Sequence, residues 1–396
     1  MLLYFSIAVL IIVVSAFFIK KRLSVEMQKK IDENFFVILS GFSAIVIISF
    51  VIYLLIHILL IGHSQISWEF IFAKPAEGLT EGGIFPAIVG TALLVIIMSI
   101  VGVPIGTITA IYLTEYAREN SVIARIIRFA VNTLAGVPAI VFGLFGLGFF
   151  IGFIGKQMDS IEQSRQMQKM EIVFNMESSP FAGDGKATPD EIKEALIKND
   201  KVYWDRQIEL TKILTEMYGE DSQIERKNVT KFYISRNRPH WAQPSLLWAA
   251  LTMALLTLPV VIVSVEEAMK TVPRELREAS LALGATKLET ILRVVLPGSI
   301  TGILTGAILA VSRGAGEVAP ILFTGAAYYL PDLPNSLSSQ FMELGYHIYV
   351  LTTQSTNVEL TKPLQYATTL VLLFLTFALN FSAIILRSKL RSRMSR

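Results

Sequence analysis

Long apolar runs, separated by polar segments, dominate the hydropathy pattern of this chain. A helix that spans a bilayer needs ~20 consecutive apolar residues, and seven runs come close to or exceed that length. Runs of this kind predict an all-α polytopic membrane protein. The predicted spans cover residues 1–19, 36–62, 84–114, 122–154, 244–270, 299–323 and 363–386.

The distribution of basic residues predicts the orientation of these spans. Lys20, Lys21 and Arg22 follow the first apolar run, and five Lys and Arg residues lie in 387–396 after the last one. Loops on the cytoplasmic side carry an excess of Lys and Arg, so we expect both clusters there. With seven spans, the N-terminus then lies outside, the C-terminus lies in the cytoplasm, and the polar loop 273–298 lies on the cytoplasmic side.

The segments between the spans suggest a division of the chain. The first run has its charges after the apolar residues, whereas a signal peptide has them before, so we expect a retained accessory helix. A central segment is polar and rich in charges of both signs, which predicts a soluble insert outside the membrane. The expected parts are 1–35 (N-terminal transmembrane helix and linker), 36–154 (first part of the permease-like core), 155–243 (insert) and 244–396 (second part of the core).

The insert carries its own helix signals. Thr188, Pro189 and Glu191 form a helix start, with Thr as N-cap, Pro at the first helical position and Glu at the third. Apolar residues at helical spacing predict a second helix over 203–218. We therefore expect a mostly helical extracytoplasmic insert, which either contacts an extracytoplasmic binding protein or is a decoration without a role in transport.

The polar loop 273–298 is punctuated like a folded element. Pro273 suits the first residue of a helix because its missing N–H would be unpaired there. Gly284 suits the end of that helix, where a left-handed residue is needed. Thr286, with Glu289 three residues on, forms a capping box that starts a second helix. The loop is expected to be a rigid pair of short helices on the membrane surface.

This loop resembles the EAA motif of bacterial ABC importer permeases. The similarity is carried by Glu278, Ala279, Ser280, Gly284, Leu296 and Pro297. The motif usually has Ala at the position of Ser280 and Ile at that of Val294. The resemblance implies that the loop inserts into a groove of a cytoplasmic ATPase, and that these residues couple the chain to ATP binding.

The sixth predicted span carries two ionisable side chains. A charge at the centre of a span costs ~2.5–3.5 kcal/mol on insertion scales, so such residues are usually functional. Arg313 and Glu317 are four residues apart, which places them on one face of a helix. Gly314, Gly316 and Pro320 weaken that helix. We predict that Arg313 binds an anion in a substrate path and that Glu317 positions it; the alternative is a plain ion pair within the membrane.

Two segments resemble PstA-type phosphate importer permeases more closely. They begin at Gly136-Val-Pro138 and at Arg313-Gly-Ala-Gly-Glu317, and Val318 replaces a Thr of that group. The resemblance implies a MetI-like six-helix core in the cytoplasmic (inner) membrane, with lipid around it. It also implies three partners: a PstC-like second permease, a PstB-like ATPase dimer and a PstS-like phosphate-binding protein outside. No nucleic acid and no cofactor is expected.

The residues that the chain lacks limit the other possibilities. There is no Cys, and the four His residues show no metal-ligand spacing. There is no phosphate-binding Gly-x-x-x-x-Gly-Lys-Ser/Thr loop, so ATP hydrolysis is expected in a partner subunit. Motifs of hydrolytic enzymes are absent as well. The competing hypotheses are a permease for sulfate, molybdate or phosphonate, and a regulatory membrane subunit that does not transport.

Overall fold

The computed structural model describes residues 25–76, 82–118, 121–176, 179–236, 240–355 and 358–394. The chain divides into two compact units, Met1–Ser64 and Gln65–Arg396. The all-α polytopic prediction is confirmed, since six helices within the described residues are long and apolar enough to cross a membrane. They are Asn34–Gln65, Phe85–Tyr116, Ala139–Asn175, Leu246–Lys270, Lys287–Gly314 and Val358–Lys389. The predicted span 1–19 lies outside the described residues.

The described part of the first unit is the long helix α2 (Val25–Gly62) and the start of the short turn η1 (His63–Gln65). Large apolar side chains are exposed along α2 from Phe35 to Leu60. A helix that is apolar on all sides suits a lipid environment, where it needs no protein partner to cover it.

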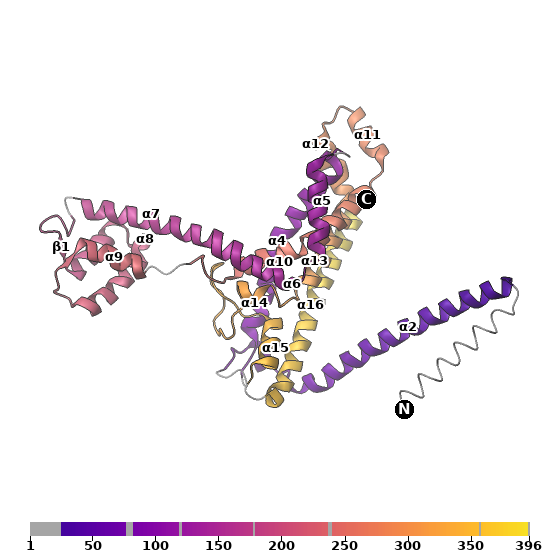
Figure 1. The fold of residues 1–396 in the computed structure, drawn as a ribbon, viewed down its shortest axis with the longest axis horizontal. Coiled ribbons are helices and arrows are strands. Elements are labelled where there is room, and N and C mark those ends of the chain that lie inside the picture. Colours follow the sequence, from indigo (N-terminus) through magenta and orange to yellow (C-terminus); the bar gives the residue numbers. More distant parts are fainter. Residues whose placement is uncertain are drawn as a thin grey trace. The chain divides into compact units, whose positions relative to one another are not determined.

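The core of the second unit is built around α10 (Leu246–Lys270), the most buried of the candidate spans. It packs against α4 (Phe85–Ile111) and α13 (Leu296–Gly314), and α16 (Val358–Met394) lies beside α13 (Figure 1). Small residues allow the close approach that helices in membranes need. A side chain at Gly106 of α4, for example, would meet Val261 of α10.

Shorter helices close one end of this core. They are α3 (Trp68–Phe72), α14 (Ile321–Thr324) and α15 (Leu344–Thr353). Buried apolar side chains from α3, from the start of α4 and from the segment before α15 form one cluster there. This end therefore has a buried apolar cluster of its own.

The predicted span 122–154 is wrong as a single helix. The structure contains a separate helix, α5 (Val122–Ala135), and then a turn at 136–138. Pro138 causes the break, because its ring fixes its own φ and disfavours helical backbone in the preceding residue. The membrane-crossing helix begins after this turn and continues past the predicted end of the span, as α6 (Ala139–Phe145), η4 (Gly146–Gly155) and α7 (Lys156–Asn175).

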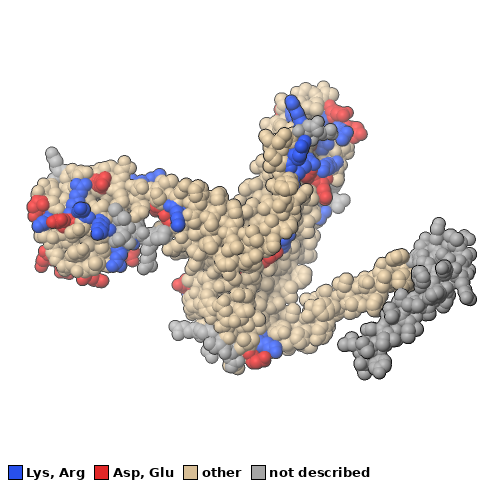
Figure 2. All heavy atoms as spheres, viewed as in Figure 1, with Lys and Arg blue, Asp and Glu red and all other residues tan. Residues whose placement is uncertain are grey.

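The insert folds around a small apolar core of its own. It consists of α7, α8 (Pro189–Tyr218), α9 (Arg226–Arg236) and two short antiparallel strands, β1 (Lys186–Ala187) and β2 (Ile224–Glu225). Its core contains Ile192, Leu196, Leu214 and Tyr233. Charged residues of both signs cover the outside of α7–α9 (Figure 2). The capping box at Thr188 is confirmed, and the two predicted helices are joined into α8 with a kink at Asp200.

The return of the chain from the insert is fastened by one carboxylate. Asp159 of α7 accepts hydrogen bonds from the backbone N–H groups of His240, Trp241 and Ala242, at 2.7–2.9 Å. Hydrogen bonds to a charged acceptor are the strong ones. The segment 240–242, which leads into α10, is therefore held to the start of α7.

Candidate functional site

The predicted helix pair of the coupling loop (273–298) is present, and its turn has the expected geometry. The helix α11 (Arg274–Ala282) ends at Gly284, whose φ is +87°. The N–H of Ala285 donates to the carbonyl of Ser280 at 3.2 Å, and the N–H of Gly284 donates to that of Leu281 at 3.0 Å. This is a Schellman motif, which requires the left-handed residue that Gly284 supplies.

The start of the second helix is also confirmed. In α12 (Lys287–Thr290) the N–H of Glu289 donates to the Thr286 hydroxyl, and the Glu289 carboxylate accepts from the N–H of Thr286 at 2.9 Å. The first helix begins one residue later than predicted, because Pro273 is its N-cap. Ser280 and Thr290 share a hydroxyl–hydroxyl bond of 2.9 Å. The Ser at this motif position thus ties α11 to α12.

No break separates the second helix of the coupling loop from the next membrane span at Leu296-Pro297. The helix α12 continues through the π-helical turn η5 (Ile291–Val295) into α13 without interruption. Pro297 has no N–H and its ring crowds the carbonyl four residues earlier. The widened turn directly before it absorbs this misfit, as π-bulges do elsewhere. The coupling loop and the membrane span therefore share one continuous helix from 287 to 314.

The outer surface of α11 is open and partly apolar. None of its residues is buried, and Glu278 and Ala279 of the motif are exposed. Leu283 is 90% exposed, and Leu276 and Leu281 are about half exposed. Exposed apolar patches of this kind outside the bilayer mark interaction sites.

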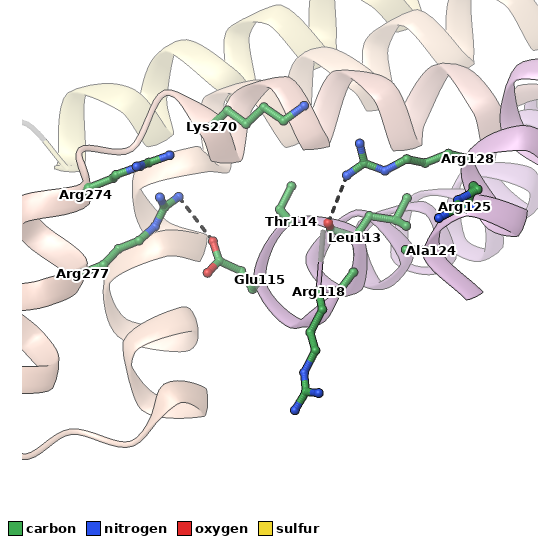
Figure 3. A pocket seen from close by; sticks show the side chains of 11 residues that line it. Leu113, Thr114, Glu115, Arg118, Ala124, Arg125, Arg128, Lys270, Arg274 and Arg277 are labelled. Atoms are coloured by element: carbon green, nitrogen blue, oxygen red, sulfur yellow. Dashed lines mark hydrogen bonds and ion pairs between the residues drawn. The ribbon is translucent and has the colours of Figure 1, made fainter. Parts of the chain in front are cut away.

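The loop is anchored to the membrane helices by Arg277. Its guanidinium donates to the carbonyl of Met269 at 2.7 Å and pairs with Glu115 of η3 (Tyr112–Tyr116) at 3.3 Å (Figure 3). Nearby, the carboxylate of Glu266 pairs with Arg128 at 3.2 Å and with Lys270 at 3.0 Å. Glu115 and Glu266 are therefore neutralised at the ends of their helices.

The predicted helix through the charged pair is wrong in part. The helix α13 ends at Gly314, and the chain turns through 315–320 before α14. Gly314 packs on Met98, whose side chain leaves no room for a Cβ. Arg313 and Glu317 thus do not share a helix face, yet the turn brings their side chains together, with Nε and Oε1 3.7 Å apart. Both side chains are partly exposed, Arg313 to 41% and Glu317 to 29%.

Arg313 lines a cavity of about 280 Å³ between α5, α10 and α13, which we call the Arg313 cavity. The other polar side chains in its wall are those of Asn132 and Ser264. The remaining wall is apolar, so the guanidinium is its main polar feature. The apolar and small lining residues are Val131, Leu134, Ala135, Leu256, Pro259, Val260 and Val263.

Asn132 and Ser264 were missed by sequence reasoning, although one signal for Asn132 exists. Arg125, Arg128 and Asn132 recur at intervals of three and four along α5, which is the pattern of a polar helix face. Treating 122–154 as a single span hid this pattern. Ser264 has no comparable signal, because its place in the cavity depends on how α10 packs.

Comparison with known proteins places this arrangement in a family. The model of the family described as "Binding-protein-dependent transport system inner membrane component" matches residues 102–396. The "Probable ABC transporter permease protein YqgI" of Bacillus subtilis (strain 168) is 25% identical over 298 residues, which cover 75% of this chain and 72% of that protein.

Proteins named as phosphate permeases are also similar. The "Phosphate transport system permease protein PstA 1" of Mycobacterium tuberculosis (strain ATCC 25618 / H37Rv) is 29% identical over 61% of this chain. The "Phosphate transport system permease protein PstA" of Yersinia pestis is 29% identical over 67% of this chain. The matches span 50% and 57% of those two proteins.

The family model covers well over half of the chain, and the six candidate spans agree with a multi-pass membrane component. Such a component is the permease subunit of an ABC importer, in which a partner subunit hydrolyses ATP and a binding protein supplies the substrate. The expected family is therefore confirmed: the chain belongs to the binding-protein-dependent transport system inner membrane components.

Proposed function

We propose that this chain is the permease subunit of an importer that moves inorganic phosphate across the inner membrane. The single observation that carries the proposal is the position of Arg313 in the wall of the Arg313 cavity. The names of the PstA relatives point to the same substrate. We infer that Arg313 binds the anion and that Glu317 holds the guanidinium in place between transport events.

The geometry suits transient binding of a tetrahedral oxyanion. A guanidinium stays charged and donates parallel hydrogen bonds from a planar fork. Its ion pair with Glu317, at 3.7 Å, is too long for a hydrogen bond, whereas charge-assisted hydrogen bonds are usually about 2.7–2.9 Å. An incoming anion can therefore compete for Arg313. One Arg does not neutralise a dianion, so we expect a second one from a PstC-like partner permease.

We infer that the coupling loop docks on a PstB-like ATPase dimer. The exposed Leu283 and the open face of α11 around Glu278 and Ala279 supply the surface. The continuous helix from 287 to 313 is about 40 Å long at 1.5 Å per residue. A tilt of the loop therefore moves Arg313 directly, without any flexible joint, and the pair of Arg277 with Glu115 carries the same motion to α4.

The orientation follows the same proposal. The coupling loop and the C-terminal basic residues face the cytoplasm, and the N-terminus and the insert face outward, where a PstS-like protein delivers the substrate. Because the chain has no cysteine, single cysteines can test this. A cysteine at Leu283 should react with an impermeant maleimide only after the cells are opened, whereas one at Glu220 in the insert should react in intact cells.

The substrate is tested by uptake into proteoliposomes that contain the complete transporter. We expect uptake of radioactive phosphate to require ATP inside and to resist an excess of sulfate, molybdate or phosphonate. Competition by one of these anions, with weak phosphate uptake, would assign the permease to that oxyanion. A regulatory subunit would instead leave phosphate uptake unchanged when Arg313 is replaced by Gln in an intact complex.

A further inference from the structure

A second cavity, which we call the basic cavity, lies where α11 meets the ends of α4 and α10 (Figure 3). Its volume is about 700 Å³, within the range of about 300–1,000 Å³ that is typical of small-molecule sites. Six basic side chains line it, and Glu115 is the one carboxylate in the lining. The basic residues are Arg118, Arg125, Arg128, Lys270, Arg274 and Arg277.

Three of these six basic side chains form ion pairs within the protein. Arg277 pairs with Glu115, and Arg128 and Lys270 pair with Glu266. Arg128 also donates to the carbonyl of Leu113 at 3.2 Å. These contacts hold the wall of the cavity in place but leave it short of negative charge.

The other three, Arg118, Arg125 and Arg274, form no ion pair within the described part of the chain. The Nε of Arg277 is buried and also has no hydrogen-bond partner among the described residues. A buried donor without a partner costs free energy, and like charges close together repel. Both penalties are relieved if an anion with several acceptor oxygens occupies the cavity.

We propose that the basic cavity binds a phosphate group, either as inorganic phosphate or as the headgroup of an anionic phospholipid. Guanidinium forks match phosphate oxygens in pairs, and basic pockets between transmembrane helices are known to hold lipid headgroups. The cavity is lined from α5 and α11, at the end of the bundle that carries the coupling loop. The inference rests on the proposed function only where the ligand is inorganic phosphate.

Occupancy of this cavity would affect coupling. Its wall joins the coupling loop, through Arg274 and Arg277, to α5, through Arg125 and Arg128. The same helix α5 lines the Arg313 cavity one turn further on, at Val131 and Asn132. A bound phosphate group would therefore brace α11 against α5 and connect the coupling loop with the Arg313 cavity.

The test uses the full-length chain in nanodiscs. In neutral phosphatidylcholine discs, radioactive inorganic phosphate is titrated; in discs that contain phosphatidylglycerol, retained lipid is measured by native mass spectrometry. The cavity variant carries Arg125→Gln with Arg274→Gln, which should fold because neither side chain forms an ion pair with the described residues. We expect one of the two probes to bind at least about tenfold more weakly, since two charge-assisted contacts are lost.

The matched control carries Arg387→Gln with Lys389→Gln, which removes two charges from α16 outside the cavity. It should bind like the wild type. Equal binding by the cavity variant, or no binding of either probe by the wild type, would overturn the proposal. So would loss of binding in Arg313→Gln, because the ligand would then belong to the Arg313 cavity, and so would displacement of the ligand by the docked ATPase.

Discussion

The two ends of α4 differ in how exposed the charged and titratable side chains around them are. At the end near Tyr116, charged side chains are numerous and partly exposed around the basic cavity, and only some of them are ion-paired. At the end near Phe85, Glu343 and His347 are 3% and 5% exposed and form no ion pair in the described structure. At the first end, partly exposed charged side chains can replace a protein contact by a contact with water. At the other end, the titratable side chains are enclosed by the protein.

The closed end is held together by Glu343, which caps α15. Its carboxyl accepts from the N–H groups of Gly345 at 2.9 Å and Tyr346 at 2.6 Å, and Thr91 of α4 bonds to the same segment. Burial raises the pKa of Glu343 to about 7, and burial lowers the pKa of His347 to about 4. Both residues lie outside the six candidate spans.

This contrast suggests a division of labour along the bundle. On the proposed function, the coupling-loop end binds and releases an ATPase, and its polar, partly exposed surface suits that role. On the same proposal, the closed end stays sealed during this movement, because Glu343 and His347 are buried and Glu343 is hydrogen-bonded within the protein. The Arg313 cavity lies between the two, at the middle of α10, and combines an apolar wall with a single cation.

The largest effect is expected for Arg313→Gln, which removes the cation between the two ends. Loss of two charge-assisted hydrogen bonds, each worth ~1.5–3 kcal/mol, should lower phosphate uptake by about 100-fold or more. The measurement is uptake into proteoliposomes with the ATPase bound. Arg387→Gln, near the C-terminal end of α16 and outside both cavities, should leave uptake unchanged. Normal uptake by Arg313→Gln would remove this residue from the substrate path.

A second prediction concerns the closed end and the pH dependence of stability. From pH about 4.5 to about 6.5, the unfolded chain carries one proton on His347 and the folded chain carries one on Glu343. The numbers of bound protons are equal, so the pair adds no slope to stability in this range.

In each single variant, stability should change with pH, because only one of the two titratable groups remains. In Glu343→Gln only His347 titrates, and because its folded pKa is lowered, stability should rise from pH about 4 to about 6.5. In His347→Gln only Glu343 titrates, and because its folded pKa is raised, stability should fall from pH about 4.5 to about 7. Each change should approach about 3 kcal/mol. Tryptophan fluorescence during unfolding in detergent measures it, and parallel curves for wild type and variants would contradict the pKa assignments.

The coupling loop was predictable because its signals are local. Gly284 and the Thr286–Glu289 capping box act within one turn of the chain, so their geometry does not depend on the rest of the fold. Gly314, Gly316 and Pro320 predicted a weakened helix, but these local signals did not predict the residue at which α13 ends. Gly314 packs against Met98, more than two hundred residues earlier, and that contact cannot be read from the local sequence. Asn132 joined the Arg313 cavity only because α5 is a separate helix that packs on α10.

A third prediction tests the rigidity of the open end. Gly284→Val places a β-branched residue at φ +87°, which L-residues avoid at a cost of about 2 kcal/mol. We expect the ATPase to lose its response to phosphate while the permease still inserts in the membrane. Gly183→Val is the control, because that position in the insert has open space and no positive φ. Full co-purification of the ATPase with unchanged transport would refute the role of this turn.

The smallest effect is expected for Ser280→Ala, which restores the residue usual in the motif. It removes the bond to Thr290, a residue that is 4% exposed, and leaves the Thr290 hydroxyl without its partner on α11. The cost should be about 1 kcal/mol, visible as roughly fivefold faster amide exchange in α11 and α12. Adding Thr290→Val should recover most of the protection, because no unpaired hydroxyl then remains. Equal exchange in all three proteins would mean that the capping motifs alone hold the two helices together.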